Sequence, residues 1–210
     1  WVVFLLVAWL AFYISLPKIR KKMLWSSLIL LPFGATQYFF LKYFWDPGTT
    51  LFNLHNLIGM DIESYGYSFA IGGIASALYE AIFRENVAKA KSYKCGCKGI
   101  HWHLHYQPIS LLLIAFFLFW TIIGLPIYFS AIIAMYLTGA MLFIARKDLR
   151  NHIIFGGLAF FLVYSLFLVL INFLFPHWFH RAYIMAIPIF IGGIPLEEFL
   201  GSFAFGLMWA

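Results

Sequence analysis

Charged residues are scarce in this chain, and their scarcity decides its class. Of 210 residues, only 10% are charged and 64% are hydrophobic, whereas ordinary globular domains carry about 25% charged residues. The mean hydropathy is +0.90. The composition therefore predicts an integral membrane protein.

Several signatures of catalysis or cofactor binding are also absent. Neither an HExxH motif nor a nucleophile elbow occurs, which excludes the hydrolases that depend on them. No lysine lies inside an apolar stretch, Lys42 being near the end of one, so a retinal Schiff base is excluded. Because a diphosphate held through Mg²⁺ needs several carboxylates around the metal, prenyl transfer is excluded too. The aspartates are far apart in sequence, at Asp46, Asp61 and Asp148.

What remains is a series of apolar stretches separated by polar turns. Most are close to the about 20 residues that cross a bilayer as a helix. We count seven and predict an all-α fold, a polytopic membrane helix bundle with about seven transmembrane helices. The stretches are residues 1–16, 24–45, 65–84, 109–123, 126–145, 152–175 and roughly 183–210.

The few basic residues indicate an orientation. They gather in three alternate loops, and positive loops face the cytoplasm, so we expect the N-terminus outside. Cys95 and Cys97 then lie in a reducing compartment, where a structural disulfide is not expected. The basic residues of the three loops are Lys18, Arg20, Lys21 and Lys22; Arg84, Lys89, Lys91, Lys94 and Lys98; and Arg146, Lys147 and Arg150.

Two segments of the chain can be overlaid without a gap. IGMDIESYGYSFAIG (58–72) and GGIPLEEFLGSFAFG (192–206) place Glu63 on Glu197 within a shared frame of glycine, serine, phenylalanine and alanine. A basic turn, a long apolar helix and an interrupted stretch precede each segment, so we predict two parallel three-helix repeats around a central cleft. The expected organisation is a first repeat (1–84), a cytoplasmic Lys/Cys/His-rich loop (85–108), a connector helix (109–125) and a second repeat (126–210).

The acids of these segments need an explanation, because a carboxylate at a helix centre costs about 2.5 to 3.5 kcal/mol on membrane-insertion scales. Glycines and prolines precede Glu63, Glu197 and Glu198, so each acid is expected to start a new half-helix. One interpretation is capping, with acids in the first turn and Asp61 as an N-cap. The other is proton donation, because a carboxyl group removed from water favours its protonated form. An aromatic cleft would then steady a carbocation formed on a lipid double bond.

The second-half sequence GIPLEEFLGSF resembles the glycine, proline and paired-acid signature of the membrane-integral lycopene cyclase domain family. In the first half, FWD (44–46), FN (52–53) and DIES (61–64) resemble the motifs of the same family. The resemblance implies a duplicated three-helix fold and an isomerase of carotenoid biosynthesis. In that family a carboxylic acid protonates a terminal double bond of lycopene, the cation cyclises, and proton loss completes the ring with no net redox change.

By this resemblance, Glu197 and Glu198 form the proton-transfer pair, with Glu63 as partner or base and Asp61 in support. Asp61 stands where the family has proline, and Ser64 stands where it has the second acid. The residues expected to contact the substrate are Trp45, Asp46, Tyr67 and Phe203.

Two local contacts are predicted from helical spacing. Tyr67 follows Glu63 by four residues and would share its face, so its hydroxyl could hydrogen-bond that carboxyl. Glu80 and Arg84 are also four residues apart, which predicts a local ion pair at the cytoplasmic end of the same helix.

The loop KCGCKGIHWHLHY (94–106) raises the question of a metal. If extended, it would place His101, His103 and His105 on one face near Cys95 and Cys97, a donor set that suits zinc. Cys-x-Cys is not the usual zinc spacing, however, and an interfacial loop with aromatic anchors is the favoured alternative. We therefore predict no metal and no cofactor.

The expected substrate is an isoprenoid or another long apolar lipid, with membrane lipids as further partners. No nucleic-acid partner is expected, and a homo-oligomer is compatible with the sequence. The alternative to an enzyme is a non-catalytic lipid-binding protein or small transporter with its site at the repeat interface.

Overall fold

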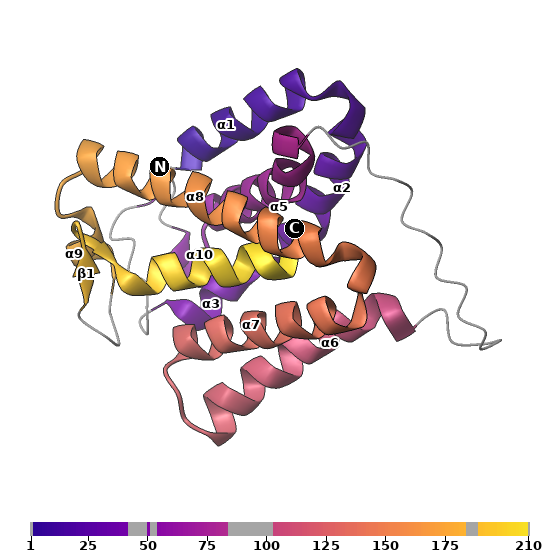
Figure 1. Ribbon diagram of the computed structural model, residues 1–210. Coiled ribbons are helices and arrows are strands. Elements are labelled where there is room, and N and C mark those ends of the chain that lie inside the picture. Colours follow the sequence, from indigo (N-terminus) through magenta and orange to yellow (C-terminus); the bar gives the residue numbers. More distant parts are fainter. Residues whose placement is uncertain (1, 42–49, 51–53, 84–102, 184–188, 210) are drawn as a thin grey trace.

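The chain folds as a bundle of helices, many of which run side by side (Figure 1). The computed structural model describes residues 2–41, 50, 54–83, 103–183 and 189–209. The predicted all-α class is confirmed, apart from one short hairpin in this part of the chain. The helices are α1 (Val2–Ser15), α2 (Arg20–Leu30), α3 (Gln37–Phe40), α4 (His55–Ile58), α5 (Ile62–Phe83), α6 (His103–Phe117), α7 (Ile127–Ala145), α8 (Arg150–Leu174), α9 (Trp178–Ala182) and α10 (Leu196–Trp209). The shorter elements are the 3₁₀ turns η1 (Pro17–Ile19), η2 (Leu31–Thr36) and η4 (Lys147–Leu149), the π-helical turn η3 (Leu118–Ile122), and the strands β1 (Phe190–Ile191) and β2 (Ile194–Pro195).

The β1–β2 hairpin was not predicted from the sequence. Gly192 and Gly193 have φ angles of +59° and +86°, and a two-residue turn with positive φ at both positions joins antiparallel strands. Asn172 of α8 holds this turn, because its Nδ2 donates a 2.9 Å hydrogen bond to the Gly192 carbonyl oxygen. The glycines expected to interrupt a helix therefore form a turn, and α10 begins at Leu196, directly after β2.

Three helical segments of the described chain are long and apolar enough to cross a membrane. They are Pro17–Phe40, Ile127–Ala145 and Lys147–Leu174, and the shorter apolar helices Val2–Ser15 and Pro108–Ile122 accompany them. These segments fit a membrane protein. The expected total of seven crossings stays a prediction.

Helix α5 lies at the centre of the bundle. Nearly every residue from Ser68 to Glu80 is buried, because α1, α2, α8 and α10 all pack against it. Such a helix has no solvent-facing stripe, and small residues let its neighbours approach closely. At Gly72, an added Cβ would lie 2.9 Å from the Cβ of Leu30.

A glycine on α5 accommodates a bulky residue of α1. Trp9 donates a 2.9 Å hydrogen bond from Nε1 to the Ser27 Oγ of α2, and both side chains occupy the space that a Cβ at Gly73 would need. The bulk at this crossing therefore comes from α1, while α5 contributes none.

At Leu207 of α10 the arrangement of large side chain and glycine is reversed. Leu207 packs against Gly139 of α7 and Gly157 of α8, where an added Cβ would come within 3.1 Å and 2.9 Å of the leucine side chain. Here α10 supplies the large side chain, and its neighbours α7 and α8 supply glycine.

The α1–α2 and α7–α8 turns are built alike. Arg20 Nε donates to the Tyr13 carbonyl oxygen at 2.6 Å, and Arg150 Nε donates to the Phe143 carbonyl oxygen at 3.0 Å. Each guanidinium also lies over the ring of that same residue, 5.4 Å and 4.8 Å from the centroid, which is a cation–π contact. Both turns lie toward the right of the bundle in Figure 1.

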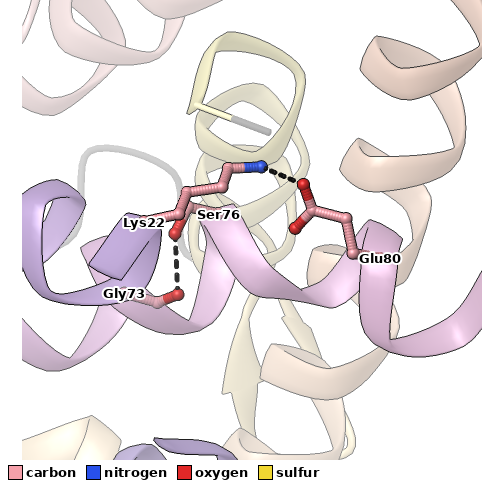
Figure 2. Close-up of polar contacts among 4 residues, drawn as sticks. All are labelled: Lys22, Gly73, Ser76 and Glu80. Atoms are coloured by element: carbon pink, nitrogen blue, oxygen red, sulfur yellow. Dashed lines mark hydrogen bonds and ion pairs between the residues drawn. The ribbon is translucent and has the colours of Figure 1, made fainter. Parts of the chain in front are cut away.

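Glu80 finds its partner on another helix. Its Oε1 lies 2.7 Å from Lys22 Nζ of α2, while Ser76 one turn earlier bonds back to the Gly73 carbonyl (Figure 2). The Glu80 side chain is only 3% exposed, and Oε2 is buried with no hydrogen-bond partner among the described residues. The predicted partner, Arg84, lies outside the described residues.

The first prediction concerns this ion pair. We expect Lys22→Met to lower the free energy of unfolding by roughly 1 to 3 kcal/mol, because a buried acceptor left without its hydrogen-bond partner costs at least about that much. The double variant Lys22→Met/Glu80→Gln is expected to recover most of the loss, since it removes the buried charge as well. Denaturant titration in detergent micelles measures both. A double variant no more stable than Lys22→Met alone would contradict the assignment.

Candidate functional site

Two neighbouring cavities meet at one carboxyl group. The larger has a volume of about 330 Å³ and is lined by residues of α2, η2, α3, α5, α6, α7, α8 and α10. The smaller, of about 210 Å³, extends toward α9. Glu198 lines both, together with Tyr67, Tyr128 and Tyr164.

The Glu198 carboxyl is held by phenol groups. It stands in the first turn of α10 and is only 5% exposed. Tyr128 of α7 donates to Oε1 at 3.3 Å, and Tyr164 of α8 donates to Oε2 at 3.4 Å. Tyr183, directly after α9, also hydrogen-bonds this carboxyl. Buried polar groups need such partners, and here they come from three separate segments.

Aliphatic and aromatic side chains make up most of the wall of the larger cavity. Phe116 and Phe117 of α6, Met135 of α7, and Phe205 and Trp209 of α10 all contribute. A concave, mainly apolar site with a few convergent polar groups is the usual form of a small-molecule pocket. The cavity therefore suits an apolar ligand with one reactive group near Glu198.

The predicted acid pair is divided by the geometry of α10. Glu197 is 1% exposed but does not line either cavity. Successive residues on a helix point in different directions, so Glu198 faces the cavities and Glu197 faces elsewhere. The expectation that both acids start a half-helix is confirmed.

The first-half acid behaves like Glu197. Glu63 stands in the first turn of α5, is half-buried and does not line either cavity. The overlay of the two halves puts Ser64 at the place of Glu198, and Ser64 does line the smaller cavity. Among the described acids, Glu198 is thus the one that reaches these cavities.

Asp61 belongs to a buried network at the start of α5, and two members of that network, Gln37 and Ser64, line the smaller cavity. It is 2% exposed and accepts hydrogen bonds from Gln37 Nε2 at 3.0 Å and Thr50 Oγ1 at 2.7 Å. Gln37 Oε1 accepts in turn from the Asp61 backbone N–H at 2.7 Å and from Ser64 Oγ at 2.6 Å. This network anchors the beginning of α5 to Gln37 of α3 and to Thr50, a structural role close to the capping interpretation.

The predicted substrate-contacting residues fall into three groups. Tyr67 lines both cavities, and its hydroxyl lies 2.8 Å from the Tyr164 hydroxyl. Phe203 lines neither cavity and packs against Tyr136 and Phe161, with ring centroids 6.2 Å and 6.0 Å away. The remaining two, Trp45 and Asp46, lie outside the described residues.

The metal question concerns side chains that are mostly outside the described part of the chain. Within that part, no three His, Cys, Asp or Glu residues are grouped to hold a metal ion. Helix α6 begins at His103, so the extended segment considered for residues 101–105 is not formed there. The loop's Cys95, Cys97 and His101 lie outside the described residues.

The phenols around Glu198 were missed in the sequence analysis. Tyr128, Tyr164 and Tyr183 come from segments far apart in the chain, and no short motif links them. One signal was present, because a tyrosine inside an apolar helix brings a hydroxyl that needs a partner. Tyr164, in the middle of α8, is such a case.

The comparisons with known proteins agree with the second-half motif. No curated protein and no solved structure matches the chain. Residues 125–210 match the family model described as lycopene cyclase, so the resemblance seen in GIPLEEFLGSF is confirmed for that part of the chain.

Proposed function

We propose that this protein is a membrane-embedded cyclase or isomerase for an isoprenoid of the carotenoid type, with Glu198 as the proton donor. The observation that carries the proposal is one carboxyl group, held by three phenols, in the wall of an apolar cavity. The family match of residues 125–210 gives the same reaction class. Neither oxidant nor reductant takes part, because the reaction only rearranges bonds.

The proposed chemistry uses the cavity in two ways. The protonated carboxyl of Glu198 adds its proton to a double bond, and the electron pair of a second double bond closes the ring. Aromatic faces stabilise the resulting cation. Phe40, packed edge-on against Tyr128 at 6.4 Å between centroids, lines both cavities together with Glu198. Loss of a proton from the ring ends the reaction.

A second candidate function is lipid binding without catalysis. Ser64 takes the position that a second acid would occupy, and Glu63 and Glu197 lie outside the cavities. An apolar cavity binds a long lipid whether or not a reaction follows. The two functions predict different results when the Glu198 carboxyl is removed. An enzyme loses ring formation, whereas a lipid-binding protein has no such reaction to lose.

We further propose that residues 1–84 and 126–210 are two copies of one unit, with seven crossings in all and the basic turns in the cytoplasm. The matching Arg20 and Arg150 turns support this proposal. The two crossings at Gly73 and Leu207 support it as well. At Gly73 the large side chain comes from α1 and the glycine from α5, whereas at Leu207 the large side chain comes from α10 and the glycines from α7 and α8. Both turns also carry the excess of basic residues that faces the cytoplasm in membrane proteins.

The second prediction tests the duplication. Gly73→Leu should prevent folding, because its side chain would overlap Trp9 and Ser27. Adding Trp9→Gly and Ser27→Gly reproduces the arrangement around Leu207 and should restore a folded protein. Size-exclusion profiles and thermal unfolding in detergent report the outcome. If the triple variant folds no better than Gly73→Leu, the two crossings are not equivalent.

The third prediction tests the reaction. In a host that accumulates lycopene, the unaltered chain should give a cyclic product, and Glu198→Gln should lower its formation by about 10² to 10⁴, the usual contribution of a general acid. Asp148→Asn is the matched control, because this acid lies in the exposed η4 turn and pairs with Arg146. Pigment analysis by chromatography provides the measurement.

Binding of the polyene to purified protein separates the two candidate functions. The enzyme is supported if Glu198→Gln still binds polyene but forms no ring. Lycopene that binds to the unaltered protein and stays linear there would instead support the lipid-binding function.

A further inference from the structure

A chain of hydroxyl groups leads away from the Glu198 carboxyl. Tyr164 donates to Oε2 at 3.4 Å, and the Tyr67 hydroxyl lies 2.8 Å from the Tyr164 hydroxyl. The other carboxyl oxygen, Oε1, accepts from Tyr128 at 3.3 Å. Both oxygens are therefore occupied, but the Oε2 side extends to a second phenol, Tyr67 of α5.

The position of Tyr67 gives this chain two ends in one cavity. Tyr67 belongs to α5, whereas Glu198 belongs to α10, and both line both cavities. Tyr164 lies between them, buried at 8% exposure and stacked on Phe160 with centroids 5.6 Å apart. Its packing fixes the middle of the chain, and all three groups line both cavities from three different helices.

Cyclisation requires an acid that protonates one carbon and a base that takes a proton from another carbon. The proposed function names only the acid. The ring is started by a proton added at one carbon and finished by a proton lost from another carbon. One carboxyl group bonded on both oxygens is poorly placed to serve both carbons. A second oxygen, connected to the first by hydrogen bonds, removes this difficulty.

We propose that Tyr67 accepts the proton released by the cyclised cation and that Tyr164 passes a proton on to Glu198. This inference rests on the proposed function of Glu198 as the donor. The ring C–H bond breaks, its electron pair becomes the ring double bond, and its proton goes to the Tyr67 oxygen. The hydroxyl proton of Tyr67 moves to Tyr164, whose own proton moves to Glu198 Oε2. The acid is thereby reloaded, both phenols are unchanged, and no co-reactant is consumed.

The hydrogen-bond directions are compatible with this transfer. The Tyr164 hydroxyl donates to Glu198 Oε2, and either hydroxyl of the Tyr67–Tyr164 pair can be the donor. Hydrogen bonds used in catalysis are often long without substrate and tighten in the complex. In this scheme Tyr67 contacts the substrate, whereas Tyr164 is a positioning and relay residue.

The fourth prediction separates relay from structure. Purified protein in liposomes is given a linear polyene, and product per protein is followed from the first turnover onward. With Tyr67→Phe or Tyr164→Phe we expect the first turnover to be retained and later turnovers to slow by about 100-fold, the usual scale of a proton-transfer role. The product should also divide into ring double-bond isomers and a water adduct, because the cation has lost its base.

The matched control is Tyr136→Phe. Tyr136 lies on α7 and lines neither cavity, and its hydroxyl donates to the Leu200 carbonyl oxygen at 3.3 Å. It should behave as the unaltered protein does. Thermal unfolding checks that each variant folds. If Tyr164→Phe does not fold, the comparison of Tyr67→Phe with Tyr136→Phe decides the relay by itself.

The outcomes are distinct. If the unaltered protein cyclises the polyene and Tyr67→Phe matches Tyr136→Phe in turnover and product, the relay is wrong while the proposed function stands. If first and later turnovers fall equally, with the product unchanged, Tyr67 has only a structural role and the relay is again wrong. If the unaltered protein does not cyclise the polyene, the proposed function fails, and the relay fails with it.

Discussion

A carboxyl group buried against hydrocarbon must receive its hydrogen bonds from the protein itself, and much of this structure follows from that requirement at Glu198. The donors are phenols on α7, on α8 and directly after α9. Because the phenols belong to different segments, those segments must be positioned around α10 so that all three hydroxyls reach the same carboxyl. Tyrosine suits the task, since its ring packs in an apolar bundle while its hydroxyl reaches the acid.

The position of the acid along the chain's path is set by where α10 begins. The glycine turn at residues 192–193 ends the preceding segment and α10 starts three residues later. Helix α5 likewise starts just after Gly59, which has a φ of +72°. Each interruption places an acid in the first turn of a buried helix. The helix interiors then carry small residues where neighbours cross closely, as at Gly72 and Gly206.

The sequence predicted those features that depend on local chemistry. Gly59 before Glu63, and the glycines and prolines before Glu197, were enough to predict the two helix starts. The apolar composition was enough to predict the helical class. The motif around Glu198 was enough to identify the family that residues 125–210 match.

Features set by tertiary packing could not be predicted in this way. Which of two adjacent acids faces a cavity depends on the rotation of α10 about its axis, which its neighbours determine. Helical spacing offered Arg84 as the partner of Glu80, but the structure brings Lys22 from 58 residues away. The phenols around Glu198 are assembled from separate helices for the same reason.

The central claim is that the Glu198 carboxyl carries a transferable proton inside the ligand cavity. Infrared difference spectroscopy of the protein in lipid nanodiscs, with and without a bound polyene, tests it most directly. The account predicts a protonated-carboxyl stretch that shifts when the polyene binds and is missing in Glu198→Gln. A spectrum in which no such band responds to the polyene, or in which the band persists in Glu198→Gln, would contradict it.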